Sequence, residues 1–84
     1  MFYIYIIYSE KVNKYYVGQT ENIEERMISH NSSISKYTSI SDDWNLVYTE
    51  SFDTINEAIQ RENEIKKKKS RKYIEWLISK NNND

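Results

Sequence analysis

The sequence predicts a single small α+β domain, in which a three-stranded mixed or antiparallel sheet is flanked by about three helices in the order ββαβαα. Two observations predict this class: segments rich in aromatic and β-branched residues occupy positions 2–17 and 44–52, and helix-period segments with capping residues follow each of them. A chain of 84 residues allows one domain with a thin core. We expect this domain to span residues 1–80 and residues 81–84 to form a disordered tail.

The first two strands are predicted to form a hairpin. Residues 2–8 read FYIYIIY, residues 9–14 are polar enough for a connection, and residues 15–17 form a short antiparallel return that stops at Gly18. Gly18 is the only glycine in the chain, and its backbone is expected either to take a positive φ or to allow another group to approach closely. Tyr5 and Tyr16 are then expected to be cross-strand neighbours.

Residues 20–30 have the pattern of a short helix. Asn22 is the expected N-cap, and Glu25 three residues later would close a capping box. Arg26 and His30 are four residues apart and therefore share a face of this helix. By residue type alone, Arg26 would be a solvated charge and His30 a helix-end histidine favoured by the helix dipole.

A loop over residues 31–44 precedes the third strand, which is expected over residues 44–52. Within the loop, Tyr37 could contribute to a phosphate site or cover the sheet edge. Trp44 is expected to anchor the core or the loop. Glu50 is expected to face solvent, with a place near a metal site as the alternative.

The second helix begins at residue 55, and Thr54 with Glu57 forms a second capping box. Glu62 falls between Ala58 and Ile65 on the face that packs against the sheet. A carboxylate in that position is costly unless it is paired or binds a metal. We favour a metal ligand, and the alternative is a buried salt bridge to one of two arginines, Arg26 or Arg61.

A basic segment, KKKKSRK, spans residues 66–72 and carries six of the 12 positive charges. Ser70 is expected to cap a third helix whose apolar face includes Trp76. The segment is either a solvated face or a ridge that contacts phosphates, whose residues are Lys66, Lys67, Lys68, Lys69, Arg71 and Lys72.

Composition excludes several classes of protein. The chain has no cysteine, which excludes disulfide frameworks and thiolate metal sites. No apolar run approaches the roughly 20 residues of a membrane span, so no membrane association is expected. We expect no secretory signal, because a strand begins almost at once without a basic segment before it, and a cytoplasmic protein is the default. The net charge of −1 is neutral on nucleic-acid binding because the distribution of charge matters more than its sum.

Two ordered motifs resemble the paired signature of the GIY-YIG nuclease superfamily, and in particular its small single-domain members similar to the N-terminal domain of UvrC. The motifs are Tyr3-Ile4-Tyr5 and, about ten residues later, Tyr16-Val17-Gly18. Tyr3 stands where the family has glycine. Further positions match the family: Arg26 and His30 on the helix after the second motif, Glu62 at the metal-binding glutamate, and Lys36-Tyr37-Thr38 as an element common in the small members.

The resemblance implies an endonuclease that hydrolyses phosphodiester bonds with Mg²⁺ or Mn²⁺ bound at Glu62. Arg26 would stabilise charge on phosphorus, and Tyr16 would act as general base toward water. Tyr5 would hydrogen-bond that network, and His30 would orient Tyr16 or relay its proton. The substrate would be single-stranded or branched DNA, with Lys36, Tyr37 and the basic ridge in contact with it. A role in DNA repair or recombination, and a protein partner that supplies DNA specificity, would follow.

Two other classes of function remain open. The domain could be a non-catalytic nucleic-acid-binding module that uses the basic ridge at residues 66–72. It could also be a protein-interaction domain that uses the helix containing Trp76. The complete set of five polar site residues favours the nuclease: Tyr5, Tyr16, Arg26, His30 and Glu62.

Overall fold

The computed structural model describes residues 1–32 and 38–81. It confirms the predicted ββαβαα order. The elements are β1 (Phe2–Ser9), β2 (Lys14–Thr20), α1 (Ile23–Asn31), β3 (Asn45–Phe52), α2 (Ile55–Lys68) and α3 (Arg71–Asn81). Asn81 therefore belongs to α3, not to the predicted tail. Lys36, Tyr37 and the rest of that tail, 82–84, lie outside the described residues.

The three strands form one antiparallel sheet in the order β2-β1-β3. β2 continues two residues past Gly18, so the prediction that the strand ends there was wrong. In the resulting register, Tyr5 lies opposite Gly18, and Tyr16 lies opposite Ile7. Tyr5 and Tyr16 are thus diagonal neighbours instead of a direct pair, and their ring centroids are 6.5 Å apart.

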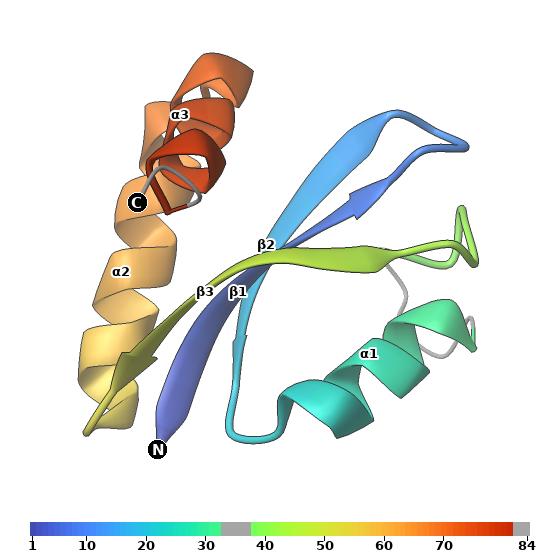
Figure 1. Ribbon diagram of the computed structural model, residues 1–84. Coiled ribbons are helices and arrows are strands. Elements are labelled where there is room, and N and C mark those ends of the chain that lie inside the picture. The colour runs from blue at the N-terminus through green and yellow to red at the C-terminus, as the bar shows by residue number, and fades with distance from the viewer. Residues whose placement is uncertain (33–37, 82–84) are drawn as a thin grey trace.

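The helices cover both faces of the sheet. Figure 1 shows α1 on one side and α2 with α3 on the other. Successive side chains of a strand point to opposite faces, and β1 is buried on both: Ile4 and Ile6 pack with α2 and α3, whereas Tyr5 and Ile7 face α1. The sheet therefore separates an aliphatic core from a polar-aromatic layer that contains Tyr5. Within the described residues, no helix is both long enough and apolar enough to cross a bilayer.

The predicted helix caps are present, except that Glu25 does not close a capping box at α1, where the Asn22 amide donates to Thr20 Oγ1 instead. The Asn22 side chain accepts a hydrogen bond from the Glu25 amide, and Thr54 with Glu57 forms a reciprocal capping box. The Tyr73 amide donates to Ser70 Oγ at 3.1 Å at the start of α3. These caps satisfy amides that a helix N-terminus leaves without intrahelical partners.

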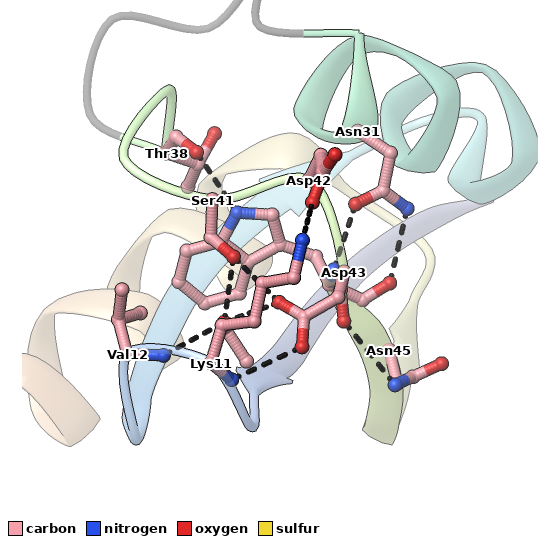
Figure 2. Close-up of polar contacts among 10 residues, drawn as sticks. Lys11, Val12, Asn31, Thr38, Ser41, Asp42, Asp43 and Asn45 are labelled. Atoms are coloured by element: carbon pink, nitrogen blue, oxygen red, sulfur yellow. Dashed lines mark hydrogen bonds and ion pairs between the residues drawn. The ribbon is translucent and has the colours of Figure 1, made fainter.

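A polar cluster fastens the loop before β3 to the β1–β2 hairpin (Figure 2). Asp43 accepts hydrogen bonds from the hydroxyls of Ser9 and Ser41 and from the Lys11 amide. Bonds from Ser41 and Ser9 hold the pKa of Asp43 down to about 2. Trp44, 4% exposed, is a core residue and also a loop anchor, because its indole Nε1 donates to the Thr38 carbonyl. The loop therefore places Thr38 against the sheet.

The prediction that Glu50 faces solvent was wrong. Its two carboxylate oxygens accept hydrogen bonds from Arg61 Nε at 2.9 Å and Nη2 at 3.0 Å, and Tyr48 also donates to it. Burial opposes ionisation of Glu50, but the bonds from Arg61 and Tyr48 prevail and lower its pKa. This bidentate pair joins β3 to α2 and engages the guanidinium of Arg61 with Glu50. Arg61 is therefore not the partner of Glu62.

Candidate active site

Tyr5 is the buried centre of the candidate site. Its side chain is 1% exposed, and its ring lies directly over Gly18 on the neighbouring strand. A Cβ at residue 18 would lie 2.5 Å from the Tyr5 hydroxyl oxygen and 2.7 Å from Cζ. Gly18 does not have a positive φ. Of the two expected reasons for this glycine, close approach is the one that applies.

Tyr5, His30 and Thr38 form a buried hydrogen-bonded chain. Tyr5 Oη lies 2.7 Å from His30 Nε2, and His30 Nδ1 lies 2.6 Å from Thr38 Oγ1. Arg26 Nε also donates to Tyr5 Oη, at 3.3 Å. Because Arg26 can only donate, the proton of the Tyr5 hydroxyl has His30 Nε2 as its acceptor. We therefore assign the imidazole proton to Nδ1, from which it is donated to Thr38.

His30 is neutral at physiological pH. Its side chain is 0% exposed, and burial together with the nearby charge of Arg26 lowers the pKa of His30 to about 4. The expectation of a helix-end histidine favoured as a cation was wrong, because desolvation outweighs the dipole here. A neutral imidazole can accept from Tyr5 while it donates to Thr38.

The lowered pKa of His30 makes folding stability depend on pH. The unfolded state binds a proton near pH 6.5 and the folded state only near pH 4, so the contribution of His30 is present above pH 6.5 and is lost as pH falls toward 4. We expect a urea-unfolding series to show this loss for the wild type. The His30→Gln variant, less stable overall, should show a smaller loss of stability over the same window. An equal loss in both proteins would contradict the assignment.

Arg26 is half-buried beside both site tyrosines and is not simply a solvated charge. The hydrogen bond to Tyr5 is the main cause that raises the pKa of Arg26, and a smaller contribution comes from Tyr16. Burial raises the pKa of Tyr5 despite the neighbouring guanidinium. Tyr5 therefore keeps its proton, and Arg26 keeps its charge.

Tyr16 differs from Tyr5 in being partly exposed. Its ring meets the His30 ring edge-on, with centroids 5.2 Å apart. On the α2 side, the ammonium of Lys66 lies 5.7 Å from the centroid of the Tyr16 ring. Tyr16 is thus held between α1 and α2 at the open margin of the polar-aromatic layer.

Glu62 lies on α2 with its side chain 17% exposed. Its partner is Lys66, whose Nζ is 2.6 Å from Oε2, and neither of the expected arginine partners contacts it. The negative charge of Glu62 adds to the causes that raise the pKa of Tyr5, of which burial is the largest. Glu62 therefore lies within electrostatic reach of Tyr5, and its partner Lys66 also approaches the Tyr16 ring.

Glu62 provides a single carboxylate for a cation. In the described part of the chain, no group of three or more histidine, cysteine or acidic residues is placed to hold a metal ion. Mg²⁺ is bound in many sites by one or two carboxylates together with waters and phosphate oxygens. Lys66 engages Oε2 and leaves Oε1 for a ligand bond. The residues present thus fit a hydrated divalent cation that is completed by the substrate.

Two site contacts had no clear signal in the sequence. Thr38 contacts His30 from a loop without periodicity, and only the resemblance, through Lys36-Tyr37-Thr38, includes it. Lys66 lies one helical turn after Glu62, a spacing that favours an ion pair, but the run of cations places it in the predicted basic ridge. An i, i+4 search around each candidate acid would have found this pair.

The basic segment does not form one continuous ridge. Lys66, Lys67 and Lys68 end α2, Lys69 adopts a left-handed backbone with φ 48°, and Arg71 begins α3. The change of direction at Lys69 distributes the cations over different surfaces: Lys66 approaches Tyr16, whereas Lys68 lies over the Tyr73 ring. Their contact with nucleic acid stays a prediction.

Comparison with known families identifies the domain. The family model described as the GIY-YIG catalytic domain matches residues 1–74. The chain belongs to the GIY-YIG family. The match extends from β1 into α3 and includes all five polar side chains of the candidate site.

Relatives of this GIY-YIG domain include proteins of the UPF0213 group. The chain is 48% identical over 65 residues to a UPF0213 protein of Staphylococcus saprophyticus, covering 76% of this chain and 78% of the relative. It is 37% identical over 81 residues to a UPF0213 protein of Clostridium perfringens, covering 95% and 86%. A solution NMR structure of a UPF0213 protein of Bacillus halodurans is similar with a TM-score of 0.57 and 33% identity, over 94% of this chain and 84% of that one. The GIY-YIG domain is thus a small, single-domain type.

Proposed function

We propose that this GIY-YIG domain is a Mg²⁺-dependent endonuclease that hydrolyses phosphodiester bonds in single-stranded or branched DNA. The observation that supports this proposal is the arrangement around Tyr5. A buried, neutral tyrosine–histidine pair holds a guanidinium and a second, partly exposed tyrosine at one margin, with the Glu62 carboxylate nearby. These are the groups that phosphodiester hydrolysis requires.

The reaction forms a bond from a water oxygen to phosphorus and breaks one phosphorus–oxygen bond of the backbone, giving a phosphate monoester and a free hydroxyl. The attacking water must lose a proton, and negative charge builds on the phosphate. A catalyst therefore has to supply a proton acceptor and positive charge at fixed positions.

The two tyrosines have different proposed roles. Tyr5 is buried, hydrogen-bonded to His30 and Arg26, and has a raised pKa, so it positions its neighbours and retains its proton. Tyr16 is the tyrosine that water and substrate can reach, and we assign it as the general base, which in its phenolate form accepts the proton that the attacking water loses. His30 would orient Tyr16 through its edge-on ring contact or relay its proton.

Arg26 and Glu62 supply the electrostatic contribution. The Arg26 guanidinium is fixed by Tyr5, and its planar fork is suited to the oxygens of a phosphate. Glu62 would hold Mg²⁺ (or Mn²⁺) through Oε1. When bound, such a cation stabilises charge on the non-bridging and leaving oxygens.

The finer features of the function are also proposals. We propose single-stranded or branched DNA as substrate, a cytoplasmic role in DNA repair or recombination, and a protein partner that adds DNA specificity. A small domain offers few surfaces for duplex recognition, and a protein partner would supply further surface.

The alternative is a non-catalytic nucleic-acid-binding module. It is favoured by the cations at the end of α2 and the start of α3. Such a module would bind DNA without a metal, with an affinity that falls with salt, and its binding would survive Glu62→Ala.

The test is incubation of the wild-type protein with end-labelled single-stranded, nicked, flapped and duplex DNA, with Mg²⁺, with Mn²⁺ and with chelator. We expect metal-dependent cleavage of the single-stranded or branched substrates and little cleavage of intact duplex. Salt-sensitive binding to all four substrates without cleavage would support the binding module and overturn the nuclease proposal.

A further inference from the structure

A groove of about 420 Å³ lies between the edge strand β2 and the junction of α2 with α3. Its volume falls in the range of about 300–1,000 Å³ that is usual for small-ligand sites. Tyr16 and Lys66 line this groove and also belong to the candidate active site. The groove is therefore continuous with the place where the scissile phosphate would lie.

The walls of the groove combine apolar and cationic side chains. Tyr15, Val17, Ile65 and Ile74 contribute its apolar surface. Its cations come from both sides: Lys14 from β2, and Lys66, Lys69 and Arg71 from the helix junction. Among residues 1–32 and 38–81, no acidic residue lines it. This combination complements a ligand that has an apolar ring and a negatively charged group.

Arg71 makes the far wall of the groove rigid. Its guanidinium donates to the Asn13 carbonyl at 2.9 Å and to Asn13 Oδ1 at 2.7 Å, and it lies 5.1 Å from the centroid of the Tyr15 ring. Lys14 and Lys69, by contrast, are exposed, and neither forms an ion pair within the described residues. Two cations at the groove are thus available to a ligand.

The charge at the start of α3 is unfavourable for the helix dipole, although Arg71 pairs with Glu75 one turn later at 3.3 Å. The first turn of α3 begins with Arg71 and Lys72 and contains no acidic residue. The helix dipole favours anions at this end and cations at the other, so these residues lie at the unfavourable terminus. They add to the positive potential of the helix N-terminus beside the groove, where an anionic ligand would offset it.

We propose that this groove binds one unpaired nucleotide next to the scissile phosphate, with the nucleotide's phosphate between Lys14 and Lys69 and its base against the apolar wall. The orientation toward the scissile bond rests on the proposed nuclease function. The nucleotide must be unpaired because a stacked and paired base has no free face for an apolar wall, whereas single strands offer one to aromatic side chains.

Nuclear magnetic resonance locates the site directly. The ¹⁵N-labelled protein is titrated with thymidine 5′-monophosphate and then with inorganic phosphate, in chelator. We expect the nucleotide to shift the amides of residues 13–17 and 69–74, and inorganic phosphate to bind at least about tenfold more weakly because it lacks the base. Equal affinities would reduce the groove to a plain anion site, and shifts centred elsewhere would overturn the proposal.

Two double variants that have the same net charge as each other test the role of the groove cations. Lys14→Gln with Lys69→Gln removes the two uncommitted groove cations. Lys11→Gln with Lys80→Gln removes two cations that contact Asp42 and the Trp76 ring instead. For a fluorescein-labelled thymidine oligonucleotide, the groove variant should lower the affinity at least about tenfold. It should also reduce the slope of log K against log salt by about 1.4, the value expected for the loss of two phosphate contacts to a single strand. Equal losses in both double variants would overturn the proposal.

The outcomes separate this inference from the proposed function. Groove shifts in a wild-type protein that cleaves nothing would sustain the nucleotide site and refute the catalysis. Cleavage by the wild type with no groove shifts would sustain the catalysis and refute the nucleotide site. The Glu64→Gln variant should retain the groove shifts, because Glu64 neither lines the groove nor pairs with a residue that does.

Discussion

The Gly18→Ala variant should lose about 1–3 kcal/mol of folding free energy, because overpacking a rigid interior is costly. The new Cβ would lie 2.5 Å from the Tyr5 hydroxyl oxygen and 2.7 Å from Cζ. The Tyr5 ring cannot move away without breaking its hydrogen bonds to His30 and Arg26. Urea unfolding monitored by circular dichroism measures the loss.

Two further variants show whether the clash is the cause. Gln19→Ala, at the next position of the same strand, should change stability by no more than about 0.5 kcal/mol. Gly18→Ala combined with Tyr5→Ala should cost much less than the sum of the two single changes, because the small side chain removes the clash. A Gly18→Ala protein as stable as the wild type would contradict the close approach described here.

Gly18 also illustrates which features can be inferred from the sequence and which depend on the folded structure. As the only glycine, at the end of an aromatic strand pattern, it is singled out by composition alone. The choice between a positive φ and a close approach depends on register, and the register depends on how the connection at residues 10–13 folds. β2 continues to Thr20 and places Gly18 opposite Tyr5, which no local pattern reveals.

The element order and the helix caps were predictable because they depend on local chemistry. Alternating and helical periods, with Asn22, Thr54 and Ser70 at helix starts, indicate ββαβαα without reference to distant residues. Pairings between distant residues were not predictable in the same way. Arg61 was a candidate partner for Glu62, but the structure joins Arg61 to Glu50 across β3 and α2.

The sequence indicates the residues of the candidate site better than the contacts between them. Periodicity places Arg26 and His30 on one helix face, and the resemblance to the family selects Tyr5, Tyr16 and Glu62. The neutral state of His30 follows from complete burial, which depends on the three-dimensional packing of α1 on the sheet. The left-handed residue Lys69 splits the basic segment, and glycine, the usual signal for this conformation, is absent there.

The Glu62→Gln variant should lose at least about 100-fold in cleavage rate, the scale on which removal of one electrostatic contribution to the transition state is felt. Glutamine keeps the size of the side chain but removes the charge that would hold the cation. The variant loses only a partly exposed ion pair to Lys66, so its stability should change by no more than about 1 kcal/mol. Single-turnover cleavage of an end-labelled oligonucleotide gives the rate, and fluorescence anisotropy in chelator gives metal-independent binding, which should be retained.

The measurement that tests the central claim most directly is this single-turnover rate for three proteins: wild type, Glu62→Gln and Glu64→Gln. Glu64 lies two residues away on the same helix, is exposed, and provides the same change of charge outside the site. Catalysis at the proposed site predicts that Glu64→Gln cleaves at nearly the wild-type rate in Mg²⁺ while Glu62→Gln is almost inactive. Cleavage by Glu62→Gln at the wild-type rate would contradict catalysis at the proposed site.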